Sequence, residues 1–87
     1  MTPIVIEGVL EKTRGAIARY PDPGDRYLFP FDRVVPVPVH MLGVTKPLEV
    51  EWWANGELVE RRELPAWTGS HTERADLVIE KPCKSQR

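Results

Sequence analysis

Residues 40–64 read HMLGVTKPLEVEWWANGELVERREL and contain the strongest local signal for the fold. Two apolar-rich runs flank Asn55-Gly56, a pair that supplies both positive-φ positions of a tight hairpin turn at little cost. The first run, residues 48–52, alternates apolar with acidic side chains, which indicates a half-buried strand. The second run, residues 57–64, is its predicted partner.

The charges of this hairpin favour one pairing register. A two-residue loop would place Glu51 opposite Glu60, and directly opposed like charges are unfavourable. A three-residue loop with a bulge instead pairs Trp52 with Leu58, apolar with apolar, and Glu49 with Arg61, acid with base. We expect this second register, which puts Trp53 on the other face of the sheet.

Length and composition limit the classes of protein to consider. The chain has 87 residues, 41% of them apolar, which suffices for one domain with a modest core. Its 12 basic and 13 acidic residues give a net charge of −1, so we expect no nucleic-acid partner. No run approaches the roughly 20 apolar residues of a membrane span, and the N-terminus lacks the features of a signal peptide. We therefore expect a cytoplasmic protein with no membrane partner.

Further strands are expected outside the hairpin, at residues 3–10, 27–31, 34–41 and 75–80. Nine prolines disfavour long helices, and we expect at most one short helix, at residues 11–20. Residues 21–26 read PDPGDR, an acidic turn without the further carboxylates of a calcium loop. Pro36 and Pro38 lack N–H donors, so one edge of their strand cannot pair through them.

These segments predict a mainly β fold: a small single-domain antiparallel β-barrel or sandwich of about six strands. We expect this domain to span residues 1–80. The basic residues 81–87 are expected to form a flexible C-terminal tail. One cysteine, Cys83, excludes an internal disulfide framework.

Several short pieces of the sequence follow one another in a characteristic order: Arg14-Gly15, Leu28-Phe29-Pro30-Phe31, His40-Met41, Pro47-Leu48-Glu49-Val50, Asn55-Gly56 and Ala75-Asp76-Leu77-Val78-Ile79-Glu80. In this order they resemble the domain-of-unknown-function 192 family of small bacterial and archaeal proteins, over roughly residues 13–80. The resemblance implies a mainly β barrel or sandwich and no reaction, because the family has no established activity. His40 stands where the family usually has Trp, and Glu49 where it usually has Asp. Family members commonly continue beyond the position of Glu80 into a further strand, so the chain looks like a C-terminally trimmed version.

The titratable residues do not form a recognisable catalytic set. His40 follows a valine-rich strand and His71 lies in a Gly-Ser-His-Thr segment, with no regular spacing that would mark zinc ligands. Ser70, His71 and Asp76 are too close in sequence to suggest the geometry of a hydrolase triad. We therefore expect a protein that is not an enzyme, with no catalytic residues, no metal and no cofactor.

Large aromatic and arginine side chains are the remaining candidates for function. The tryptophans are efficient sources of buried area, and those left exposed beside an arginine are typical anchors of interfaces. The candidate binding residues are His40, Trp53, Arg61, Trp67 and His71. We predict a binding or self-association module whose partner is a protein or a second copy of the chain. The alternative is a small-molecule or carbohydrate site near His40, Trp67 and His71, which could be hydrolytic.

Overall fold

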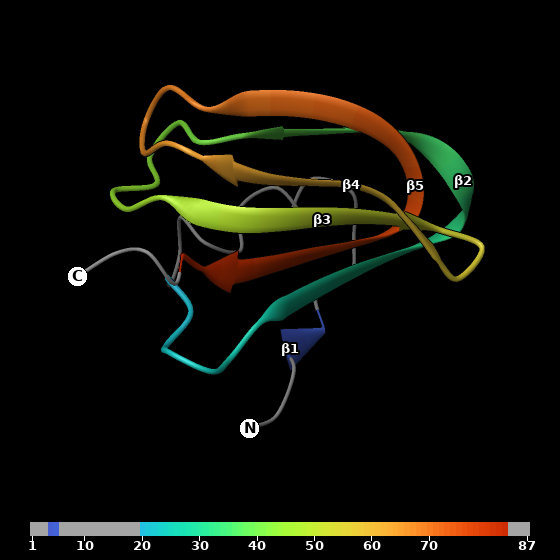
Figure 1. Ribbon diagram of the computed structural model, residues 1–87, viewed down its shortest axis with the longest axis horizontal. Coiled ribbons are helices and arrows are strands. Elements are labelled where there is room, and N and C mark those ends of the chain that lie inside the picture. The colour runs from blue at the N-terminus through green and yellow to red at the C-terminus, as the bar shows by residue number, and fades with distance from the viewer. Residues whose placement is uncertain (1–3, 6–19, 84–87) are drawn as a thin grey trace.

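The computed structural model describes residues 4–5 and 20–83, and all of its strands belong to one sheet (Figure 1). The strands are β1 (Ile4–Val5), β2 (Tyr27–His40), β3 (Leu48–Ala54), β4 (Glu57–Leu64) and β5 (Ser70–Pro82). They lie in the order β1-β2-β5-β3-β4. The four long strands pair antiparallel, and β1 makes a short parallel pairing with β2. The described residues contain no helix.

The mainly β class is confirmed, and the number of strands differs from the expected six. The segments expected as separate strands at residues 27–31 and 34–41 form the single strand β2, with a register shift between Pro30 and Val35. β1 and β4 lie at opposite ends of the strand order, so the described strands form an open sheet without closure into a barrel. Most of the strand expected at residues 3–10, and almost all of the helix expected at 11–20, lie outside the described residues.

A sharp bend in β2 and β5 folds the sheet back on itself. Both strands turn at the same end of the molecule, so their upper halves lie across from their lower halves (Figure 1). Trp52 Nε1 on β3 donates a buried hydrogen bond of 3.0 Å to the backbone oxygen of Val37 on β2. The Trp52 ring also packs edge-on against His71 of β5, with ring centroids 5.1 Å apart. Trp52 therefore joins the two halves of the bent sheet.

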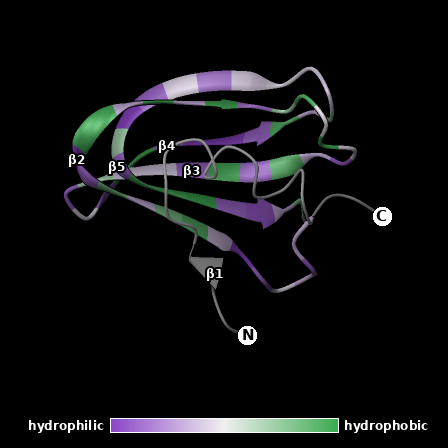
Figure 2. Ribbon diagram, turned by 180° about the vertical axis from the view of Figure 1, so that it is seen from behind, coloured by the Kyte–Doolittle hydropathy of each residue, from purple (hydrophilic) through white to green (hydrophobic). Residues whose placement is uncertain are grey.

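The space between the two halves holds the hydrophobic core. Side chains alternate along each strand, so that Leu48, Val50 and Trp52 of β3 are buried in the core while Trp53 points to the outer face; Figure 2 shows this alternation as changing colours along β3. The core consists of the side chains of Tyr27, Phe29, Val37, Val39, Met41, Val44, Leu48, Val50, Trp52, Leu64, Ala75 and Val78. Each of the four long strands, β2, β3, β4 and β5, contributes side chains to this core.

The β3–β4 hairpin forms at the expected turn but in a different register. The loop has only two residues, Asn55 and Gly56, with φ of 53° and 81°, so the three-residue loop was wrong. A bulge farther along β4 shifts the pairing so that Glu51 lies opposite Arg61. The bulge thus removes the Glu51–Glu60 repulsion that a two-residue loop would otherwise create.

The same shift changes the partners of the two adjacent tryptophans. Trp53 lies opposite Leu58, Trp52 lies opposite Glu60, and Glu49 lies opposite Glu63. The expected pairings of Trp52 with Leu58 and of Glu49 with Arg61 were therefore also wrong. The assignment of Trp52 and Trp53 to opposite faces is confirmed, because Trp52 is fully buried and Trp53 is partly exposed.

β5 is longer than the strand expected at residues 75–80. It begins at Ser70, so His71 belongs to a strand and not to the preceding loop. At its other end Lys81 pairs with Glu49 and Pro82 pairs with Leu48. The sheet thus includes residues that we expected in the tail, whereas residues 84–87 lie outside the described part of the chain.

Candidate functional site

Two loops meet at the end of the sheet where β3 begins and β4 ends (Figure 1). Residues 41–47 connect β2 to β3, and residues 65–69 connect β4 to β5. The Met41 N–H donates to the Gly69 oxygen at 2.9 Å, and the Trp67 N–H donates to the Val44 oxygen at 3.1 Å. These backbone hydrogen bonds fix each loop against the other.

Two glycines allow the loops to take this shape. Gly43 has a φ of 86°, and the turn around it closes with a hydrogen bond of 2.9 Å from the Val44 N–H to the Met41 oxygen. In the second loop, the N–H of Gly69 donates to the Pro65 oxygen at 3.1 Å. A Cβ on Gly69 would lie 2.8 Å from the Leu64 Cβ, so only glycine fits there without displacement of the backbone.

Trp67 is presented to solvent by a strained backbone. Its φ is 65°, in the left-handed region that costs a residue with a Cβ roughly 1–2 kcal/mol. The residue is nevertheless 54% exposed, so about half of the indole is not used for packing against the protein. A strained backbone that carries a half-exposed indole makes Trp67 a candidate contact residue.

Leu42, in the neighbouring loop, is 66% exposed. Its neighbours Met41 and Val44 are buried and anchor that loop in the core. Leu42 and Trp67 are the two large apolar side chains exposed on these loops, whose backbones are joined by hydrogen bonds, and we call this pair of residues the loop-tip patch. The two loops carry no acidic residue and one basic residue, Lys46.

The two candidate histidines lie close together along the sheet but on opposite faces. His40 is exposed and lies opposite Ser70, whereas His71 lies opposite the core residue Val39. Since side chains of directly opposed residues share a face, His71 points inward and His40 points outward. The inward ring pairs with Glu73, with 2.7 Å between His71 Nε2 and Glu73 Oε2. The structure therefore does not bring the two histidines into one pocket.

Trp53 and Arg61, two further candidates, bind the same buried carboxylate. Glu51 on the outer face of β3 is 4% exposed. Its Oε1 accepts a hydrogen bond of 3.0 Å from Trp53 Nε1. Its Oε2 accepts from Arg61 Nε at 3.1 Å and from Lys81 Nζ at 2.8 Å. Burial alone would raise the pKa of Glu51, but the hydrogen bonds and the positive charge of Lys81 outweigh it and lower the pKa.

Glu49 completes this cluster of charges. Its carboxylate lies 3.3 Å from Arg61 Nε and 3.7 Å from Lys81 Nζ. Two acids and two bases from three adjacent strands thus neutralise one another across the outer face. The ion pairs link β4, β3 and β5. We assign the cluster a structural role, because each charged group has a partner within it.

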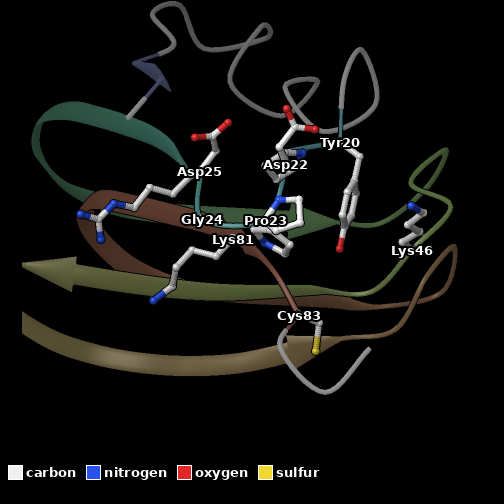
Figure 3. Close-up of a pocket in the computed structure, with 11 residues that line it drawn as sticks. Tyr20, Asp22, Pro23, Gly24, Asp25, Lys46, Lys81 and Cys83 are labelled. Carbon is white, nitrogen blue, oxygen red and sulfur yellow. The ribbon is translucent and has the colours of Figure 1, made fainter. Parts of the chain in front are cut away.

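A groove that the sequence did not suggest runs beside the turn at residues 21–26 (Figure 3). Its volume is about 690 Å³, and it is lined by residues 20–26, Lys46 and the end of β5. Tyr20 donates a hydrogen bond to the Pro47 oxygen, and the Lys46 ammonium lies 5.4 Å from the centroid of the Tyr20 ring. The carboxylates of Asp22 and Asp25 point away from Lys81 (Figure 3). The charged groups therefore do not converge on one position where a ligand would sit.

Glu80 is the second feature that the sequence did not reveal. It lies on the core face of β5, opposite Tyr27 on one side and Val50 on the other, and is 6% exposed. Burial raises the pKa of its carboxyl group to about 8. No hydrogen bond or salt bridge to Glu80 is seen among the described residues. The sequence places Glu80 at the end of the strand expected at residues 75–80 and does not indicate which face it occupies.

The described residues contain no group of three or more His, Cys, Asp or Glu side chains that could hold a metal ion. Within the same part of the chain, no helix has the length and apolar character needed to cross a membrane.

Comparisons with protein-family models, curated proteins and solved structures give no match to this chain. The resemblance to the domain-of-unknown-function 192 family stays a prediction, and the geometry above is the basis for a function.

Proposed function

We propose that the protein is a non-enzymatic binding module that contacts its partner through the loop-tip patch, Leu42 and Trp67. The observation that carries this proposal is the backbone of Trp67, which has a φ of 65° while the side chain is 54% exposed. Strain of this kind persists where the surrounding structure enforces it, and it gathers at binding and catalytic sites.

The chemistry of the patch supports the proposal. Tryptophan is among the residues that most often dominate the free energy of binding at protein surfaces. The hydrogen bonds between the two loops hold Trp67 in place before any partner arrives, so little conformational entropy is lost on binding. A preorganised aromatic anchor is what a binding surface requires.

The other candidate residues support a binding module over an enzyme. Arg61 and Trp53 stabilise Glu51, and His71 is paired with Glu73. The small-molecule alternative relied on His40 and His71 sharing a pocket, and their opposite faces argue against it.

Replacing Trp67 with glycine tests the proposal, because glycine adopts the left-handed conformation freely. We expect Trp67→Gly to leave the free energy of unfolding within about 1 kcal/mol of the wild-type value, measured by urea denaturation. Trp52→Phe is the matched control and should lower the free energy of unfolding by about 1–3 kcal/mol, since it removes the hydrogen bond to Val37. A loss of more than about 2 kcal/mol in Trp67→Gly would show that Trp67 serves folding and would refute the proposal.

A further inference from the structure

We propose that the partner of the loop-tip patch is a phospholipid bilayer, into whose interfacial region Trp67 and Leu42 insert. This inference rests on the proposed function, because it names the class of surface that the same patch contacts. It departs from the expectation of no membrane partner, which rested on the lack of a spanning run, because a surface contact by two loop residues needs no spanning segment.

The size of the patch argues against a second copy of the chain as the occupant. Trp67 and Leu42, at 54% and 66% exposure, together offer on the order of 250 Å². A stable protein–protein interface buries about 800 Å² on each partner. A symmetric dimer formed by this patch alone would therefore be too small to persist, whereas a bilayer accepts a small apolar tip without a matching surface.

The charges around the patch favour a phospholipid surface. Residues 41–47 and 65–69 contain no acidic side chain, so nothing on these loops repels lipid phosphates. The one basic side chain is Lys46, which is exposed at the base of the first loop. Tryptophan is enriched at membrane–water interfaces because its ring is apolar and its N–H is polar.

The position of the patch also suits insertion. Neither Leu42 nor Trp67 lines the groove at residues 20–26, so the patch is not part of that concavity. Both residues lie in connecting loops at one end of the sheet, and the loops are fixed by backbone hydrogen bonds. An ordered loop loses little entropy on entering the interface, which makes a two-residue contact effective.

Co-sedimentation of the full chain with vesicles tests this inference. The vesicles are of phosphatidylcholine, with and without phosphatidylglycerol. We expect wild-type protein to sediment with both and its tryptophan emission to shift to shorter wavelength. Trp67→Ala and Leu42→Ser should each weaken the partition constant by about tenfold or more. Leu58→Ser is the matched control, since Leu58 is 41% exposed but lies on β4 at the hairpin turn, and its partition should change less than about twofold.

Three results would overturn the inference. The first is wild-type protein that stays in the supernatant with both kinds of vesicle. The second is vesicle binding that Trp67→Ala and Leu42→Ser leave unchanged, which would assign the contact to another surface. The third is a dimeric mass in light scattering that Trp67→Ala reduces to that of one chain, which would make the second copy the occupant. If vesicles do not bind while Trp67→Gly keeps its stability, the lipid inference fails and the binding module stands.

Discussion

Replacing Glu80 with glutamine is expected to make the protein more stable at neutral and alkaline pH. Glu80 is a buried acid on the core face, 6% exposed between Tyr27 and Val50. Glutamine keeps the size and shape of the side chain and cannot ionise. The substitution therefore measures how ionisation of the buried carboxyl group affects the free energy of unfolding, without a change in side-chain size.

The expected magnitude follows from the shift of the pKa. In the unfolded chain the carboxyl group has its ordinary pKa of 4.5, and burial raises the pKa in the folded protein to about 8. Between these values the folded state keeps a proton that the unfolded state has released, so stability falls as the pH rises. At about 1.4 kcal/mol per pH unit, the loss relative to pH 4.5 is about 3 kcal/mol at pH 7 and about 5 kcal/mol above pH 8. Below pH 4.5 both states are protonated and the cost vanishes.

The assay is urea denaturation at a series of pH values from 5 to 9, followed by tryptophan fluorescence. Wild-type protein and Glu80→Gln should be within about 1 kcal/mol at pH 5 and should diverge steadily as the pH rises. Glu57→Gln, which removes an exposed carboxylate near the hairpin turn, controls for the change of net charge. Parallel curves for wild-type protein and Glu80→Gln would refute the reasoning, because the folded state would then hold no extra proton.

Three further substitutions test other parts of the structure. Gly69→Ala should lower the free energy of unfolding by roughly 1–3 kcal/mol, because its Cβ would lie 2.8 Å from the Leu64 Cβ. Gly56→Ala, which has open space but a φ of 81°, should cost roughly 1 kcal/mol in the same denaturation assay, and an equal cost at both glycines would contradict the packing argument. Lys81→Met should cost about 1.5–3 kcal/mol at pH 7, since it removes a charged hydrogen bond of 2.8 Å to buried Glu51. Because the pKa of Glu51 is lowered in the folded state, its contribution is present above pH 4.5 and is lost as the pH falls below that value. Circular dichroism during acid titration should show Lys81→Met unfolding at higher pH than wild-type protein, and coincident curves would contradict the role of Lys81.

The local signals in the sequence predicted the strands better than their pairing. Asn55-Gly56 marks the hairpin correctly because its backbone conformation depends on those two residues alone. The register depends on the position of the bulge, and no residue of β4 marks that position in the sequence. The prediction that Glu51 would not lie opposite Glu60 was correct, but the sequence could not say whether a longer loop or a bulge would separate them.

The long-range features could not be derived in the same way. β2 reads as two strands because Pro30, Asp32 and Arg33 interrupt the apolar pattern, yet β5 pairs with β2 on both sides of the interruption, with a register shift between Pro30 and Val35. Lys81 is far from Glu51 in sequence, and only the alignment of β5 beside β3 brings them together.

The candidate site was predicted in part. The sequence singled out Trp67 as a candidate binding residue, and the structure places its side chain at the surface. Its positive φ and its neighbour Leu42 were not foreseen, because both depend on hydrogen bonds between two loops that are distant in sequence. The histidines were grouped by residue type, and strand alternation places them on opposite faces.

The most direct test of the bilayer contact observes the three tryptophan indoles separately. Trp52 Nε1 bonds to the Val37 oxygen and Trp53 Nε1 bonds to Glu51, so their ¹H–¹⁵N resonances report on the interior and on the charge cluster. We expect addition of phosphatidylcholine bicelles to shift the indole resonance of Trp67 and to leave those of Trp52 and Trp53 in place. A spectrum in which Trp67 does not respond would contradict the bilayer contact, and one in which Trp53 shifts while Trp67 stays would assign the contact to another surface.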